Sequence, residues 1–176
     1  MKVVPAFLIM CAGVIACAQQ PAAQTPNPLA NLSFMQGDWS GAQNFNNTAG
    51  PAMVGDATDR IEIGIAGRYL CEMLSTTLPG RKPTDTRHFI SYDKQSGKYT
   101  AWWFNDTSTH PSELSGDLTG NKLVLLSSPS GPGPVLRATY ESPSANTLTF
   151  LLEIKQGENW TKLFLTTYSK KASAQP

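Results

Sequence analysis

The chain has 176 residues, a length that suits a single domain. Hydrophobic residues make up 40% and charged residues 15%, so the chain is too apolar for a disordered polymer and too poor in Lys, Glu and Arg for a coiled coil. Lys2 is the only base before Asp38, and removing this leader leaves 13 bases against 13 acids. A balanced charge offers no basic stripe to a phosphate backbone, which argues against a nucleic-acid partner.

Residues 1–17 have the anatomy of a signal peptide, because Lys2 precedes an apolar run of about a dozen residues. This run is shorter than the ~20 apolar residues of a membrane-spanning helix. Two cleavage sites remain open. Ala16-Cys17-Ala18 fits an ordinary signal peptidase, whereas Val14-Ile15-Ala16-Cys17 resembles the bacterial lipobox, which we favour. We therefore expect export to the cell envelope, either with a lipid anchor on Cys17 as the sole link to the membrane or as a secreted protein.

Three further segments are predicted from composition. Residues 18–28 are rich in Gln, Ala and Pro and suit a flexible tether, residues 29–170 suit the folded domain, and residues 171–176 suit a disordered tail. Cys11 leaves with the leader and Cys17 is lipidated or lost, so Cys71 has no partner for an internal disulfide. We expect Cys71 to behave as a small buried hydrophobe.

The predicted domain begins with a helical pattern. Leu29, Leu32 and Met35 recur every three residues, and Pro28 suits a first helical turn. We expect a short helix over residues 28–35 that plugs one end of the domain.

After this helix, runs rich in β-branched and aromatic residues alternate with Gly, Pro, Asn, Asp and Ser clusters about every ten residues, which is typical of an all-β protein. Sequential hairpins predict an antiparallel meander, and about ten strands avoid exposed edges by closing into a barrel. The expected strands are residues 37–45, 55–65, 68–77, 87–93, 98–105, 112–118, 122–127, 135–141, 147–155 and 160–169.

Alternation along the strands assigns side chains to the two faces of the sheet. Every second residue of 148–154 and of 61–65 is apolar, so these residues are predicted to face inward. Trp102 and Trp103 are adjacent and must lie on opposite faces. We place Trp103 inside, because it shares its parity with Tyr99, and Trp102 outside.

Gly37-Asp38-Trp39 directly follows the predicted helix, and this Gly-x-Trp resembles the start of the calycins, the lipocalin and fatty-acid-binding-protein group. Further stretches, in their order and spacing, are similar to the DUF1579 family of uncharacterised bacterial proteins over residues 29–170. They are residues 63–70, 91–103, 114–118 and 167–170. The resemblance implies a calycin-like barrel in which Gly37 and Trp39 close one end.

Two departures limit what the resemblance implies. The family tends to have Asp at Asn105 and often Arg at Lys170. The related nitrobindins hold haem through a histidine near the C-terminus, whereas the last histidine here is His110. We therefore do not extend the haem binding of the nitrobindins to this chain, and we expect no cofactor.

Four residues are candidates for contact with a ligand. His88 shares a face with Ile90 and is either a hydrogen-bond partner for a ligand or a structural histidine. Arg68 either anchors a ligand carboxylate or pairs with Glu72 on the same face. Tyr99 and Trp103 are candidates for the wall of a cavity, and Trp103 could equally belong to the core.

The sequence contains no enzyme signature and no cluster of metal ligands: His88 and His110 are far apart, and Cys71 has no neighbouring cysteine. Two hypotheses remain. The barrel binds a small, mostly apolar ligand in its cavity, or it is filled and serves as a structural or protein-interaction module of the envelope. Nothing in the sequence specifies an oligomeric state.

Overall fold

The computed structural model describes residues 27–46, 52–106, 108–130 and 133–172. The predicted signal peptide, the lipidation site Cys17 and nearly all of the predicted tether lie outside the described residues, as do residues 173–176 of the predicted tail. In the part that is described, no helix has the length and apolarity needed to span a membrane.

Ten antiparallel strands form a closed barrel, in which each strand pairs with its neighbours in sequence and β1 also pairs with β10. This confirms the predicted meander barrel, and every strand lies within three residues of its predicted bounds. The strands are β1 (Gly37–Phe45), β2 (Met53–Gly64), β3 (Tyr69–Thr77), β4 (Thr84–Asp93), β5 (Lys98–Asn105), β6 (Ser112–Thr119), β7 (Lys122–Ser127), β8 (Leu136–Ser144), β9 (Thr147–Gln156) and β10 (Asn159–Lys170).

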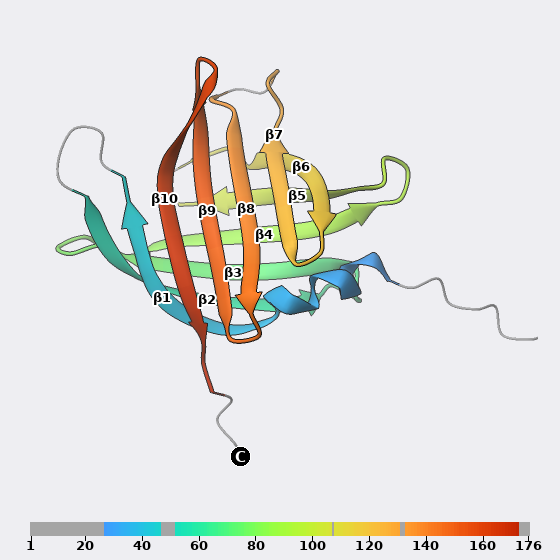
Figure 1. Cartoon of the computed structure of the whole chain (residues 1–176), viewed down its shortest axis with the longest axis horizontal. Helices are drawn as coiled ribbons and strands as arrows, with labels where there is room; N and C mark the ends of the chain where they lie inside the picture. The colour runs from blue at the N-terminus through green and yellow to red at the C-terminus, as the bar shows by residue number, and fades with distance from the viewer. Residues whose placement is uncertain (1–26, 47–51, 107, 131–132, 173–176) are drawn as a thin grey trace, which may run out of the picture.

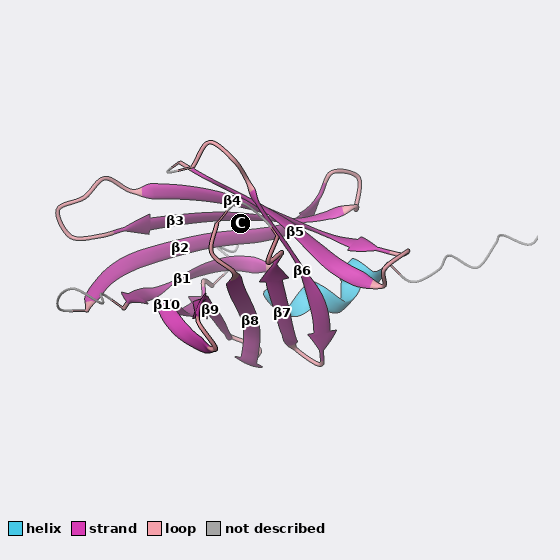
Figure 2. Ribbon diagram, turned by 90° about the horizontal axis from the view of Figure 1, so that it is seen from above, coloured by secondary structure: helices cyan, strands magenta, loops and turns pink. Residues whose placement is uncertain are grey.

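The barrel is flattened into two groups of strands that cross steeply. In Figure 1, β7 to β10 run nearly vertically in front, and β2 to β5 run across behind them. Seen from above, in Figure 2, the same two groups enclose the interior between them. Side chains from both groups therefore meet in one core.

The helix η1 (Pro28–Met35) lies at one end of this barrel, as predicted. It is a 3-10 helix, and with three residues per turn the spacing of Leu29, Leu32 and Met35 puts all three on one buried face. The Asn27 side chain caps it by accepting a hydrogen bond from the Leu29 amide at 3.1 Å. The end that carries η1 is called the closed end below, and the opposite end the open end.

Two glycines allow strands to cross closely. A Cβ atom at Gly41 would overlap the Thr167 carbonyl oxygen of β10, and one at Gly116 would overlap the Val124 carbonyl oxygen of β7. Larger residues are therefore excluded from both positions by backbone, which cannot move aside as a side chain can.

The predicted faces are largely confirmed. Trp103 and the alternate residues of 148–154 face inward, and Trp102 lies on the outer face, where it is half-buried. Ile65 was predicted to face inward, and this is wrong: it sits in the β2–β3 turn and is 59% exposed. The prediction of a buried Cys71 is also wrong, because its outward parity leaves it half-exposed.

Candidate functional site

Two rows of inward-facing side chains meet in the middle of the barrel. Glu72, His88 and Trp103 stand directly opposite one another across β3, β4 and β5. On the other group of strands, Tyr140 stands opposite Phe150. These five residues form the central cluster.

Glu72 is the centre of the polar contacts in this cluster. Its Oε2 atom lies 2.7 Å from His88 Nδ1 and accepts a hydrogen bond of 2.7 Å from the Tyr140 hydroxyl. His88 Nδ1 is also 3.0 Å from the Tyr140 oxygen. All three side chains are buried, so these bonds replace water around the carboxyl group.

Burial sets the protonation of the cluster. It raises the pKa of Glu72 to about 7, although the hydrogen bond from Tyr140 works in the opposite direction. It lowers the pKa of His88 to about 3, against the opposing charge of Asp59. His88 is therefore neutral at pH 7, and its Nδ1 donates to Glu72 whenever Glu72 is ionised, since an ionised oxygen can only accept.

Asp59 of β2 makes the second acid of the interior. Its pKa is raised well above the usual range, first by burial, then by the charge of Glu72 and by a hydrogen bond with Glu72. Two carboxylates cannot donate to each other, so a hydrogen bond between Asp59 and Glu72 requires a proton on one of them. A proton shared between the two acids supplies the missing donor.

Trp103 Nε1 is a buried donor without a hydrogen-bond partner among the described residues. The buried Tyr168 hydroxyl interacts with the Thr166 side chain, which works against the rise of its pKa. Burial, followed by the charges of Asp59 and Glu72, raises the pKa of Tyr168 well above its usual value. No described group of three or more His, Cys, Asp or Glu side chains could hold a metal ion.

Aromatic rings extend from the central cluster towards the open end. His88 stacks on Trp103 with ring centroids 4.4 Å apart, and Trp103 meets Phe150 edge to face at 5.8 Å. Phe164 follows at 5.5 Å from Phe150, and Phe45 at 5.4 Å from Phe164. This aromatic ladder offers flat, apolar surfaces along one side of the interior.

The inward-facing residues become more exposed from the closed end to the open end. On β9, Leu148 and Phe150 are fully buried, whereas Leu152 and Ile154 are half-buried. The same increase in exposure towards the open end occurs on β4, β5, β8 and β10. The half-buried inward-facing residues there are Thr86, Asn105, Leu136 and Phe164. The closed half is thus filled with side chains, and solvent reaches the inner wall from the open end.

A hollow of about 770 Å³ lies beside this open half. Its lining combines residues at inward-facing positions with residues at outward-facing ones and with the β5–β6 and β7–β8 loops. The inward-facing residues are Ser112, Leu114, Ser127 and Leu136, and the outward-facing ones are Lys98, Glu113, Ser115 and Leu126. Ser112 stands directly opposite Trp103 across β5 and β6. The hollow therefore reaches the strand next to Trp103, which is not itself among the lining residues.

The structure brings two of the four predicted ligand residues together and places the other two elsewhere. His88 and Trp103 are stacked in the central cluster. Tyr99 lies at the closed end, where its hydroxyl donates to the Pro28 carbonyl at 3.0 Å. Arg68 is exposed in the β2–β3 turn, so the alternative pairing with Glu72, which bonds to His88 and Tyr140 instead, does not form.

The turn that holds Arg68 has an unusual backbone. Ile65 and Ala66 have φ values of 47° and 56°, and Gly67 follows with 76°. Left-handed conformations are costly for a β-branched residue. Arg68 also lines a surface hollow of about 430 Å³ together with Lys94, outside the barrel.

Gly37 and Trp39, the residues that the resemblance assigns to closure, lie at the closed end. Trp39 is fully buried and donates from Nε1 to the Met35 carbonyl of η1 at 2.8 Å. Lys170 lies over the Trp39 ring, with Nζ 5.1 Å from the ring centroid. Gly37 has φ 141°, and a side chain there would meet Lys170.

Sequence reasoning missed Asp59 and Tyr140 as members of the site. The alternation around Asp59 did carry a signal, because Ala57 and Ile61 share its parity and face inward. Tyr140 likewise alternates with Ala138 on β8. A polar residue between inward-facing apolar ones is the pattern that could have identified both.

The comparisons with known proteins agree with this architecture. Residues 26–170 match the family described as "Protein of unknown function (DUF1579)". The structure is similar to that of Rv2717c from M. tuberculosis, with a TM-score of 0.64 and 13% identity, covering 82% of this chain and 97% of that one. No curated protein matches the chain.

Two further solved structures share the fold at low identity. The S-type phycobiliprotein lyase CPES from Guillardia theta has a TM-score of 0.57 and 9% identity, over 84% of this chain and 94% of that chain. A protein of unknown function from the DUF3598 family of Nostoc punctiforme has a TM-score of 0.51 and 17% identity, over 88% of this chain and 53% of that chain. At these identities the likeness shows the calycin-like fold alone. The family match is what assigns the chain: it belongs to the DUF1579 family.

Proposed function

We propose that the protein binds a small, mostly apolar molecule in the open half of its barrel. The hollow of about 770 Å³ carries this proposal, because it is bordered by inward-facing Leu114 and Leu136 and reaches the strand pair that holds Trp103. Ligand sites are typically concave, mainly apolar and ~300 to 1,000 Å³ in size, with few polar groups. The half-buried inner wall at the open end supports the same site.

Each part of the interior has a role in this proposal. The closed half is packed and supplies stability, while the aromatic ladder supplies contact area for a planar ligand. Trp103 Nε1 is a buried donor without a partner, and an acceptor on the ligand would satisfy it. His88, which stands opposite Trp103 on the neighbouring strand β4, holds the Trp103 ring in place by stacking on it.

A neutral fluorescent probe tests the proposal. N-phenyl-1-naphthylamine is uncharged at pH 7, and its emission should rise saturably when it enters the barrel. Leu136→Trp fills the inner side of the hollow and should weaken this binding about tenfold or more. Leu151→Trp is the matched control, since Leu151 is also half-buried on the neighbouring strand but faces outward. Equal binding by both variants, or no binding by the parent, would contradict the proposal.

The alternative, an interaction module with a filled barrel, is supported by a different face. A shallow hollow of about 460 Å³ on the outside of β7 to β10 is lined by Val124, Leu151 and Leu165. Two ion pairs flank it: Lys122–Glu141 at 3.2 Å and Arg137–Glu153 at 2.6 Å. The same experiment separates the two functions, because a filled barrel takes up no probe.

A further inference from the structure

Four aromatic side chains gather on the outside of β3, β4 and β5. Phe89 and Trp102 stand directly opposite each other across β4 and β5. The ring centroid of Tyr69 lies 6.2 Å from that of Trp102 and 6.4 Å from that of Phe89, and Phe104 lies 5.9 Å from Phe89. We call these four residues the outer aromatic face. It belongs to the group of strands that runs behind β7 to β10 in Figure 1.

The outer aromatic face is open to solvent although it is apolar. Phe104 is 45% exposed, and the other three rings occupy outward positions at which they are half-buried. Cys71 and Met73, at half-buried outward positions of β3, extend the apolar surface. Contiguous apolar surface of this kind, unlike scattered single residues, marks a contact with a protein or a membrane.

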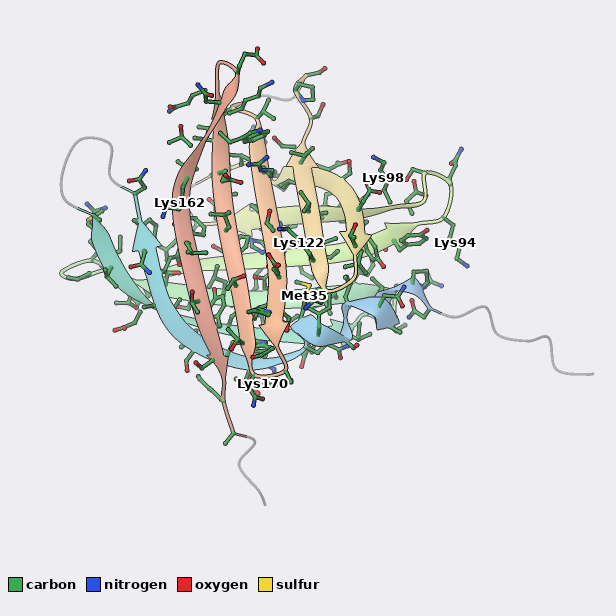
Figure 3. The ribbon with its side chains drawn as sticks, in the orientation of Figure 1. Met35, Lys94, Lys98, Lys122, Lys162 and Lys170 are labelled. Atoms are coloured by element: carbon green, nitrogen blue, oxygen red, sulfur yellow. The ribbon has the colours of Figure 1, made fainter. Side chains whose placement is uncertain are left out.

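A basic hollow adjoins the outer aromatic face at the closed end. It is the surface hollow of about 430 Å³ that Tyr69 also lines, and its described lining holds two bases, Arg68 and Lys94, and no acid. Both bases are exposed, and Figure 3 shows Lys94 extending outward from the turn between β4 and β5. Ile65, whose carbonyl accepts from the Arg68 amide at 3.2 Å, adds an exposed apolar side chain in the β2–β3 turn.

The described chain begins at this basic hollow. Asn27 lines the hollow and donates from Nδ2 to the Gly67 carbonyl at 3.0 Å. Residues 18–26 separate Asn27 from Cys17, the proposed lipidation site, and nine residues span at most ~30 Å. A lipid on Cys17 would therefore keep the basic hollow and the adjoining outer aromatic face close to the bilayer.

We propose that the outer aromatic face docks on the surface of a phospholipid bilayer, with its rings at the level of the headgroups and with Arg68 and Lys94 beside lipid phosphates. Trp and Tyr rings favour the membrane–water boundary, because each combines a large apolar body with one polar atom. Exposed bases near the surface are attracted by anionic lipids. The sequence led us to expect the Cys17 anchor as the sole link to the membrane, and this face adds a second one.

Two observations favour a bilayer over a protein partner for this face. The proposed anchor enters the described chain at the same end of the barrel, and the basic hollow beside the rings lacks an acid that a second copy of the chain would need for charge complementarity. The docking is independent of ligand binding inside the barrel, because it uses only outward-facing residues and the β2–β3 and β4–β5 turns.

A brominated lipid tests the contact. The protein is purified from its host and reconstituted in vesicles of phosphatidylethanolamine and phosphatidylglycerol, with and without dibrominated phosphatidylcholine, which quenches tryptophan at short range. We expect the brominated lipid to quench the parent, and we expect Trp102→Phe to lose this quenching. Trp160→Phe is the matched control and should keep it, because Trp160 is also half-buried and outward-facing but lies on β10, beneath Arg137.

Two further variants test the neighbouring groups. Phe104→Ser removes the most exposed ring without changing a tryptophan, and it should reduce the quenching of Trp102. Arg68→Gln with Lys94→Gln should weaken docking on vesicles that contain phosphatidylglycerol by about fivefold for each base. Lys155→Gln with Lys162→Gln is its matched control, since both lysines are exposed on β9 and β10.

The outcomes decide between the membrane and other partners. Quenching that is absent in the parent, or equal in the parent and Trp102→Phe, overturns the proposal. If the purified protein carries no lipid, it is mixed with the same vesicles and judged by the same quenching. A chain that sediments as a dimer, is dissociated by Trp102→Arg and shows no quenching of Trp102 would assign the face to a second copy, which also overturns the proposal. Equal docking by the parent and the Arg68–Lys94 double variant overturns the role of the basic hollow.

Discussion

Tyr140 of β8 donates its hydroxyl proton to Glu72 of β3 over 2.7 Å, a bond between residues 68 positions apart in the sequence. In the strand order of the closed barrel, β3 and β8 lie on opposite sides. This bond therefore spans the interior and ties together the two groups of strands seen in Figure 1.

Tyr140→Phe tests that bond, because it keeps the ring stacked on Phe150 at 4.5 Å and removes only the hydroxyl. Glu72 loses a buried donor, so we expect a loss of about 1 to 3 kcal/mol in the free energy of unfolding. The pKa of Glu72 should also rise further, since the Tyr140 hydrogen bond lowers it. Denaturant unfolding and an NMR titration measure the two effects. Tyr92→Phe, on the partly buried ring beside Tyr99, is the control and should change neither.

The stability of the barrel should depend on pH in an unusual direction. Glu72 has a pKa of about 7 in the fold against an ordinary 4.5, so the folded state binds more protons in this interval and stability falls as pH rises through it. Asp59, with its raised pKa, acts in the same direction. His88 opposes both between its folded pKa of about 3 and its ordinary 6.5, where the unfolded state binds more protons.

Between pH 4.5 and 6.5 the proton that Glu72 retains in the fold is offset by the proton that His88 gains on unfolding, so the raised pKa of Asp59 sets the sign of the slope. We expect the free energy of unfolding to fall as the pH rises through this interval. Urea unfolding at several pH values measures the slope. In Asp59→Asn with Glu72→Gln only His88 contributes, and the slope should reverse sign. A parent whose stability rises steadily from pH 4.5 to 6.5 would contradict the raised pKa of Asp59.

Trp39→Ala should remove the closure of the barrel. The ring is fully buried and bonded to Met35, so its loss should cost ~3 to 5 kcal/mol, the range for deleting a large buried aromatic side chain. Thermal and denaturant unfolding measure this loss. Trp102→Ala is the matched control and should cost less, because Trp102 is half-buried on the outer face. Equal costs for the two variants would rule out a special role for Trp39.

Ile65→Asn should stabilise the protein. Ile65 has φ 47° and is 59% exposed, so the change relieves backbone strain and removes little packing. We expect a gain of about 1 kcal/mol, since a left-handed residue costs ~1 to 2 kcal/mol and asparagine adopts this conformation more readily. Probe affinity should stay unchanged, because the turn lies at the closed end. A loss of stability would show that the Ile65 side chain makes contacts that outweigh the strain.

Cys17→Ser tests the proposed lipid anchor. In the proposed anchor the thiol that follows the lipobox-like Val14-Ile15-Ala16 carries a lipid through a thioether, which serine cannot form. We expect the parent in the membrane fraction of its host and the variant in the soluble fraction, with the same unfolding free energy. Cys71→Ser is the matched control and should stay in the membrane fraction. Parent and variant in the same fraction would refute lipidation at Cys17.

Local patterns were sufficient to predict the strands and their faces. Strand alternation has a period of two, so the inward positions of His88 and Trp103 follow from their own neighbours once the strands are recognised. The three-residue spacing of Leu29, Leu32 and Met35 likewise marks the buried face of η1. These features depend on short stretches of chain, which is why the sequence by itself determined them.

The acid pair and its contacts depend on the closure of the barrel. Alternation places Asp59, Glu72 and Tyr140 on the inner wall, but the register of all ten strands decides the height at which each one meets the opposite side. The β2–β3 turn shows the same limit, because its left-handed path takes Ile65 and Arg68 out of the alternation that their neighbours follow. Strand periodicity carries no information about distances across the interior, and so only the tertiary structure brought two acids, a histidine and a tyrosine together without a base.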